Sequence, residues 1–172
     1  MTKINGKHCI DMILNTISKS VHYFSKNQII FVVPKQDKRL IKFLKDRNIR
    51  IVHDYDRNVY QAFLEVDADI KVRMTADSPM IHWMEIDKNL NMLKEGYKYA
   101  ANEITKFGNA CEAFWNDTLI KYKPESIDEQ QHVTLQIRRN CKEVWIPSFM
   151  LDYPGSVEHM EQVTNQWRFR ND

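Results

Sequence analysis

Several common catalytic signatures are missing from this sequence of 172 residues. It contains no G-x-G-x-x-G turn, no phosphate-binding P-loop, no G-x-S-x-G elbow for a nucleophilic serine and no H-E-x-x-H zinc motif. These absences argue against a nucleoside triphosphatase or a zinc hydrolase of a common type.

Cysteine, glycine and proline are all scarce. The three cysteines, Cys9, Cys111 and Cys141, form no C-x-x-C pair, which argues against a zinc ribbon or redox motif and favours a reducing compartment. With only 4 Gly and 5 Pro, we predict long regular elements and few loops. No apolar run reaches the roughly 18 residues of a membrane span, and polar residues interrupt the N-terminus. We therefore expect a cytoplasmic protein with no membrane partner.

Composition predicts one globular domain spanning residues 1–172. Apolar residues make up 43% of the chain and charged residues 28%, which is ordinary for a globular protein. The formal net charge of +2 is too small to require a nucleic-acid partner and does not exclude one.

The first half of the chain predicts a parallel βαβ unit. Residues 28–34 and 49–55 are short β-branched runs, and residues 35–48 between them carry an apolar helical face. Strand, helix and strand in this order favour a right-handed crossover. A short helix over 57–66 and a third strand over 68–74 are predicted to follow.

The spacing of apolar residues predicts a long helix over 79–107. Apolar side chains recur every three or four positions, Pro79 suits the first helical position, and Gly108 suits the end. Such a helix would be about 43 Å long. We therefore predict an α/β fold, mainly helical, with a small parallel sheet and a long central amphipathic helix.

Three further segments complete the predicted architecture. Residues 7–24 have the apolar spacing of a helix, and so do residues 110–124. Residues 126–146 are ambiguous, because Ser126 and Glu129 suit a helix capping box whereas the alternation after them favours a β-hairpin. We predict the hairpin there, and one short helix over 156–166.

The beginning of the long predicted helix is the first candidate site. His82, Glu85 and Asn89 are spaced to share one helical side, next to Trp83. Unpaired backbone N–H groups in a first helical turn favour an anion, and Lys71 and Arg73 lie just upstream. The alternative is a half-buried histidine at the mouth of a helix.

A polar stripe on the helix predicted over 7–24 is the second candidate. His8, Asp11 and Asn15 follow each other at spacings of three and four, so Asp11 can orient the imidazole of His8. If both polar stripes face one cleft, His8 and His82 form an acid–base pair. The predicted catalytic residues are His8, Asp11, His82 and Glu85. The predicted substrate-binding residues are Asn15, Lys71, Arg73, Trp83 and Asn89.

Two weaker patterns concern metal and nucleic acid. The D-x-D patterns at 54–56 and 67–69 can hold a divalent cation, but such short patterns are common by chance, so we assign no metal site and no cofactor. Basic residues cluster over 35–50, and Trp167 and Phe169 alternate with arginines at the end of the chain. This mixture is typical of surfaces that bind nucleic acid, or else of a solvated helix and a frayed terminus.

Two stretches resemble an uncharacterised family found mainly in tailed phages. That family has a K-H-V-x-K-M-I-like helix start, and later H-P-x-x-x-W before a helix that ends in Y-R-Y-G-K-x-H. The matching segments here are KHCIDMIL (7–14), SPMIHW (78–83) and TKFGNAC (105–111), with Ser78 where the family has histidine. The resemblance implies a role in nucleotide metabolism, DNA modification or host takeover, in the host cytoplasm.

We therefore predict a phage-type protein that binds or modifies a phosphate-bearing substrate, either a nucleotide or a nucleic-acid base. The alternative hypothesis is a non-catalytic protein that binds a host protein or nucleic acid through its basic helix and its Trp/Arg-rich tail.

Overall fold

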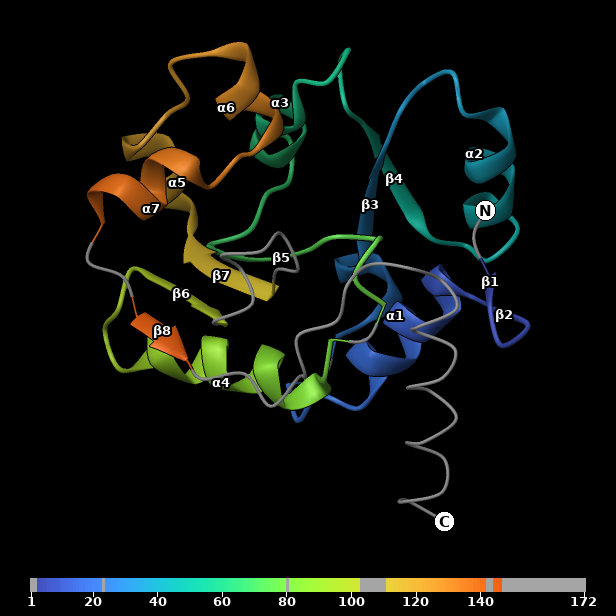
Figure 1. The fold of residues 1–172 in the computed structure, drawn as a ribbon, viewed down its shortest axis with the longest axis horizontal. Helices are drawn as coiled ribbons and strands as arrows, with labels where there is room; N and C mark the ends of the chain where they lie inside the picture. Colours follow the sequence, from blue (N-terminus) through green and yellow to red (C-terminus); the bar gives the residue numbers. More distant parts are fainter. Residues whose placement is uncertain (1–2, 23, 80, 103–110, 142–143, 147–172) are drawn as a thin grey trace.

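The computed structural model describes residues 3–22, 24–79, 81–102, 111–141 and 144–146 (Figure 1). The predicted parallel unit is confirmed: β3 (Ile30–Val33), α2 (Lys38–Lys45) and β4 (Arg50–His53) follow in order, and β3 pairs with β4 in parallel. A 3-10 turn, Lys26–Gln28, precedes β3. The short helix and third strand are also present, as α3 (Val59–Leu64) and β5 (Ile70–Met74).

The first helix is shorter than predicted. A two-stranded hairpin, β1 (Lys3–Ile4) with β2 (Lys7–His8), comes first, and α1 spans Cys9–Ser18. Asn5 and Gly6 form the hairpin turn with φ of 48° and 75°. Asn-Gly is the sequence that such a two-residue turn favours, because both positions need positive φ.

A four-stranded sheet forms the second half of the fold. Its strand order is β5-β7-β6-β8, with β6 at Tyr99–Asn102, β7 at Cys111–Trp115 and β8 at Val144–Ile146. The central strand β7 is antiparallel to both β5 and β6, and β8 is parallel to β6. The molecule is therefore a mixed α/β fold in which a parallel pair accompanies a larger mixed sheet.

The prediction of one long helix over 79–107 is wrong. Helix α4 spans only Trp83–Lys94, and the chain then turns into β6. Gly96, with φ of 101°, donates its N–H to Leu93, while Tyr97 donates to Met92, which is the bonding pattern of a Schellman cap. The apolar residues after the turn continue the helical spacing by coincidence. The predicted helix end at 107–108 lies outside the described residues.

Gly96 therefore determines where α4 ends, and Gly96→Ala should destabilise the fold. A β-carbon added there would meet no atom within 4 Å, so the effect comes from the backbone alone. We expect a loss of about 1–2 kcal/mol in the free energy of unfolding, because alanine is strained at positive φ. Urea denaturation measures it, and unchanged stability would contradict this account of the helix end.

Two other predicted elements are also wrong. Residues 110–124 do not form one helix, since Cys111–Trp115 is β7 and α5 spans only Asn116–Lys121. Residues 126–146 do not form a hairpin; they contain α6 (Ile127–Gln131), α7 (Leu135–Asn140) and then β8. Ser126 caps α6 by accepting a hydrogen bond from the Glu129 backbone N–H. The helix predicted over 156–166 lies outside the described residues.

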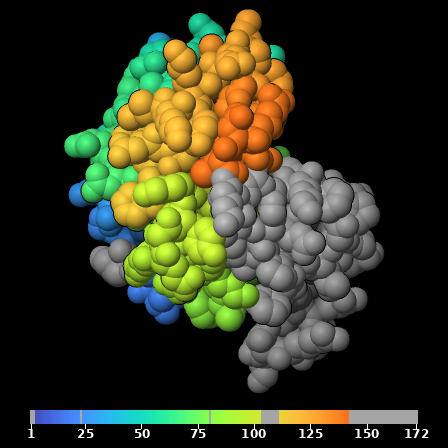
Figure 2. Space-filling view, turned by 90° about the vertical axis from the view of Figure 1, so that its left-hand side faces the viewer, coloured from blue at the N-terminus to red at the C-terminus, as the bar shows by residue number. Residues whose placement is uncertain are grey.

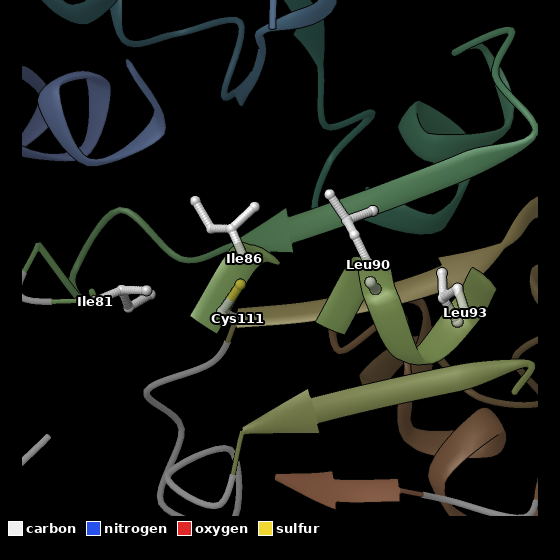
Figure 3. Packing of buried hydrophobic residues seen from close by; sticks show 6 residues of the cluster. Ile81, Ile86, Leu90, Leu93 and Cys111 are labelled. Carbon is white, nitrogen blue, oxygen red and sulfur yellow. The ribbon is translucent and has the colours of Figure 1, made fainter. Parts of the chain in front are cut away.

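Helices cover both faces of the four-stranded sheet (Figure 1). On one face, α4 packs Ile86, Leu90 and Leu93 against the strands, with Cys111 of β7 among them (Figure 3). On the other face, Phe114 of β7 lies in a second cluster with Ile137 of α7. Figure 2 shows that parts of the segment that forms α5 and α7 border the segment that ends α4 and forms β6.

Helix α1 joins the parallel pair β3-β4 to the four-stranded sheet. Its Ile10 packs with Val33 of β3, whereas Ile17, like Val72 of β5, packs against the cluster formed by α4 and β7. The Thr16 hydroxyl also donates to the Ile81 carbonyl at 3.1 Å. Apolar burial on one helix thus fixes the parallel pair to the larger sheet. Within the described part of the chain, no helix is long and apolar enough to span a membrane.

Candidate functional site

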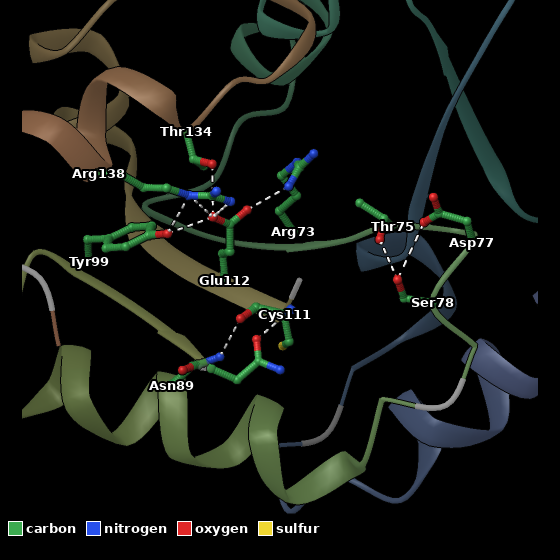
Figure 4. Close-up of polar contacts among 11 residues, drawn as sticks. Arg73, Thr75, Asp77, Ser78, Asn89, Tyr99, Cys111, Glu112, Thr134 and Arg138 are labelled. Carbon is green, nitrogen blue, oxygen red and sulfur yellow. Dashed lines mark hydrogen bonds and ion pairs between the residues drawn. The ribbon is translucent and has the colours of Figure 1, made fainter. Parts of the chain in front are cut away.

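A polar turn follows the carboxyl end of β5 (Figure 4). The hydroxyls of Thr75 and Ser78 are hydrogen-bonded at 2.9 Å, and Ser78 also donates to the Asp77 carboxylate at 3.4 Å. Ser78 is buried and fixes the turn, while Asp77 is exposed. In open α/β folds, ligands bind just beyond the carboxyl ends of strands, so Asp77 lies where a ligand is expected.

A buried charge cluster links β5 to β7 close to this turn (Figure 4). Its centre is Glu112 of β7, which is 0% exposed. Because β5 and β7 pair with Arg73 opposite Glu112, the Arg73 Nη1 reaches a Glu112 oxygen at 2.6 Å. The other carboxylate oxygen accepts hydrogen bonds from Arg138, from Tyr99 at 2.6 Å and from Thr134 at 2.8 Å.

These neighbours keep Glu112 ionised. Burial alone would raise the pKa of its carboxyl, but the guanidiniums of Arg73 and Arg138 and the Tyr99 hydroxyl outweigh burial and lower that pKa. Burial, together with the negative charge of Glu112, raises the pKa of Tyr99, so its phenol stays protonated and donates. The cluster therefore holds two positive charges and one negative charge at neutral pH.

His82 lies at the mouth of α4. Its Nδ1 accepts a hydrogen bond from the Met84 backbone N–H at 3.3 Å, and its ring lies 5.2 Å from that of Trp83, the first helical residue. Burial, followed by the nearby charges of Lys19 and Lys88, lowers its pKa. The imidazole is thus neutral at pH 7 and acts as the helix cap.

This environment predicts a pH signature for His82. Below the ordinary histidine pKa of 6.5, the unfolded chain takes up a proton that the folded protein resists, so stability is lost as the pH falls. His82→Asn keeps a capping side chain that does not titrate. We expect its stability to fall less between pH 7 and about pH 5 than that of the wild type. The free energy of unfolding is measured by urea denaturation at several pH values. If it changes with pH equally in the wild type and in His82→Asn, this account of His82 is wrong.

The other predicted residues of α4 face the sheet. Glu85 is 2% exposed and accepts a hydrogen bond from the Asn102 amide at 2.7 Å. Asn89 is fully buried and donates to the Cys111 carbonyl at 2.9 Å, while its Oδ1 has no partner within the described residues. These contacts link α4 to β6 and β7, so Glu85 and Asn89 act in packing. Burial also raises the pKa of the Cys111 thiol, so it is not a reactive thiolate.

The predicted residues of α1 lie apart from those of α4. His8 precedes α1 and packs its ring on Phe43 of α2, with ring centres 4.9 Å apart. Asp11 pairs with Arg47 at 3.2 Å, and Asn15 is exposed.

His8 and His82 lie near opposite ends of α1. Thr16, near the end of α1, donates to the carbonyl of Ile81, the residue before His82, whereas His8 directly precedes the first residue of α1. Ten helical residues, about 15 Å of rise, lie between these two ends of α1.

Lys71 and the basic surface complete the predicted residues. Lys71 is 5% exposed and donates to the Phe63 carbonyl at 2.7 Å and to Asn116 at 2.6 Å; burial lowers its pKa. It therefore fixes β5 to neighbouring elements. The lysines of α2 are exposed as predicted, although Lys42 is paired with Asp46. The Trp/Arg-rich tail lies outside the described residues.

The sequence predicts Arg73 as a binding residue but does not predict its partners in the structure. Tyr99 and Glu112 were assigned to helices and Arg138 to a hairpin, so nothing brought them near Arg73. The run CEAFW over 111–115, a single acid among apolar residues, is typical of a buried strand. A carboxylate in such a strand needs cationic partners, and this was the available signal.

Comparison with known proteins gives likeness in structure only. No protein family model matches the chain, and no curated protein matches its sequence. A cytidylyltransferase from Leptospira borgpetersenii serovar Hardjo-bovis (strain JB197) superposes with a TM-score of 0.78 at 15% identity, over 97% of this chain and 78% of that one.

Two other solved structures are similar. The 4-diphosphocytidyl-2C-methyl-D-erythritol synthase from Anaerococcus prevotii DSM 20548 gives a TM-score of 0.65 at 15% identity, over 98% of this chain and 88% of its own. A CMP-2-keto-3-deoxy-manno-octonic acid synthetase complexed with CTP gives a TM-score of 0.65 at 14% identity, over 96% of this chain and 91% of its own. At these identities the likeness establishes the fold alone, and the chain has the α/β fold of these three proteins.

Proposed function

We propose that this protein binds a cytidine nucleotide at the carboxyl end of β5 and transfers its nucleotidyl group to an acceptor hydroxyl. The observation that carries the proposal is the likeness in fold to a cytidylyltransferase across 97% of the chain. The polar turn at Thr75, Asp77 and Ser78 supports it, because the Thr75–Ser78 hydrogen bond fixes the turn and Asp77 places an exposed carboxylate where α/β folds bind ligands.

Asp77 is the proposed contact to a nucleotide-bound magnesium ion. No group of three metal-ligating side chains lies together among the described residues, so a metal would need ligands from the nucleotide. Mg²⁺ commonly binds through one or two carboxylates plus substrate phosphates, and one exposed carboxylate meets this requirement. The ion would neutralise phosphate charge in the complex.

The proposed reaction is a displacement at the α-phosphorus. The acceptor oxygen forms a bond to this phosphorus, the bond to the bridging oxygen breaks, pyrophosphate leaves, and the acceptor proton passes to a base. The protein's contribution is to position the two substrates and to stabilise their charge. The acid–base roles predicted for His8 and His82 stay predictions, and so does the phage-family resemblance.

A thermal-shift panel tests the proposed function. The purified protein is heated with CTP, UTP, ATP or GTP, each with and without magnesium, and with single- and double-stranded DNA. A ligand at 100 times its Kd stabilises the native state by about 2.7 kcal/mol, so binding raises the melting temperature. We expect the largest shift with CTP and magnesium. Shifts with DNA alone would instead support the alternative, an interaction protein that uses the basic face of α2.

A further inference from the structure

The buried charge cluster around Glu112 contains more positive than negative charge. Arg73 and Arg138 lie on opposite sides of one carboxylate, and their side chains are only 14% and 22% exposed (Figure 4). A charge held away from water is costly unless a counterion accompanies it. Within the described part of the chain, two guanidiniums share one carboxylate, which leaves one positive charge without a counterion.

The unused hydrogen-bond donors of this cluster belong mainly to Arg73. Only its Nη1 contacts Glu112, and within the described residues its Nε and Nη2 have no partner. Arg138, by contrast, donates hydrogen bonds from both Nε and Nη2 to Glu112, and its Nε also donates to the Tyr99 hydroxyl. A free guanidinium edge presents two parallel N–H groups, which match the oxygens of a phosphate or carboxylate.

The position of Arg73 connects this edge to the polar turn. Arg73 lies on β5, two positions before Thr75 and four before Asp77. The carboxylate of Glu112 holds the Arg73 side chain in place, so little conformational entropy would be lost when an anion binds.

We propose that Arg73, positioned by Glu112 and supported by the charge of Arg138, forms an oxyanion subsite that takes a phosphate or carboxylate group. The subsite rests on the proposed function only for the source of its anion. That source is either a phosphate of the nucleotide or the acidic group of a second substrate.

Calorimetric titration with inorganic phosphate tests the subsite directly. Arg73→Gln removes the proposed contact and leaves Glu112 paired with Arg138, Tyr99 and Thr134, so the fold should persist. We expect phosphate affinity to fall about tenfold or more, since a charge-assisted hydrogen bond contributes roughly 1.5–3 kcal/mol. Arg139→Gln is the matched control: Arg139 is the next residue of α7, is 60% exposed and pairs with Glu129.

A second variant, Arg73→Lys, shows whether a loss of phosphate affinity comes from the missing contact or from a folding defect. Arg73→Lys retains the charge and can still reach Glu112, but it lacks the planar fork. We expect its phosphate affinity to lie between those of the wild type and Arg73→Gln.

Two arms of the experiment separate the sources of the anion. If the subsite binds a nucleotide phosphate, Arg73→Gln weakens CTP but not cytidine, and CTP displaces inorganic phosphate. If it binds a second substrate, Arg73→Gln leaves CTP affinity unchanged, and phosphate still binds to the CTP-saturated protein.

Phosphate affinity that is equal in wild type and Arg73→Gln, with and without CTP, would overturn the subsite. Failure of the wild type to bind CTP would count against the proposed function alone, because the phosphate titration does not depend on CTP.

Discussion

Replacing Glu112 by alanine is expected to cost about 3–5 kcal/mol of folding free energy, a large part of the 5–15 kcal/mol that stabilises a typical domain. The variant would leave Arg73 and Arg138 facing each other in a mostly buried space without a carboxylate between them. Tyr99 and Thr134 would lose their acceptor at the same time. Urea denaturation followed by circular dichroism measures the loss.

An exposed ion pair supplies the control for Glu112→Ala. Asp46 pairs with Lys42 on α2, and their side chains are 56% and 77% exposed, so Asp46→Ala should cost less than about 1 kcal/mol. The two variants remove carboxylates of very different burial. Equal losses would show that the Glu112 cluster contributes no more than a surface pair and would contradict the account of its charges.

Acid should weaken the same cluster. Because its neighbours lower the pKa of Glu112, the ionised carboxylate stabilises the fold above the ordinary glutamate value of 4.5. This contribution is lost as the pH falls through the lower folded pKa. The stability that Glu112 contributes is lost only below pH 4.5, whereas the contribution of His82 already changes below pH 6.5. One series of unfolding measurements over pH therefore separates the two effects.

Asp77→Asn is expected to weaken CTP binding in the presence of magnesium by about tenfold or more while leaving the fold intact. The amide keeps the shape of the side chain and its contact with Ser78, but it removes the negative charge proposed to hold the cation. Because Asp77 is exposed, unfolding stability should change by no more than about 0.5 kcal/mol. Calorimetric titration with and without magnesium measures both affinities.

Asp117→Asn is the matched control for Asp77→Asn. Asp117 is also exposed, and it follows Asn116, whose N–H donates to Asp69 just before β5 begins. The control thus removes the same charge at the other end of the strand and should leave CTP affinity unchanged. If Asp77→Asn binds CTP as the wild type does, with the same magnesium dependence, the proposed role of Asp77 is wrong.

The parallel unit could be predicted from the sequence because its signals are local. The runs that form β3 and β4 are short and β-branched, Pro34 ends the first, and Asp37 caps α2 by accepting from Leu40. Each of these features acts within a few residues. No distant contact had to be known for the elements to be recognised.

The end of α4 shows where this reasoning failed. The apolar spacing continues from Leu93 to Tyr97 and Ala100, although the chain has already left the helix at Gly96. A glycine within a helical pattern also marks a possible cap, and here its positive φ decides the structure. The strands β6 and β7 were not predicted either, because their residues were assigned to the helices predicted over 79–107 and 110–124.

The candidate site could be predicted only in part. Arg73 was predicted to bind an anion from its charge and its place just upstream of the predicted long helix. Its partner Glu112 lies 39 positions away and meets it only through the register of β5 with β7. Likewise, the roles predicted for Glu85 and Asn89 assumed a solvent-exposed helix face, whereas both side chains are buried between α4 and the sheet.

The most direct test of the central claim is to map where CTP binds. Backbone amide resonances of the ¹⁵N-labelled protein are followed by NMR while CTP and magnesium are added. The account predicts that the largest shifts occur from Arg73 to Ser78. Shifts that gather on α2 instead, or no shifts at CTP concentrations in the millimolar range, would contradict a nucleotide site at the end of β5.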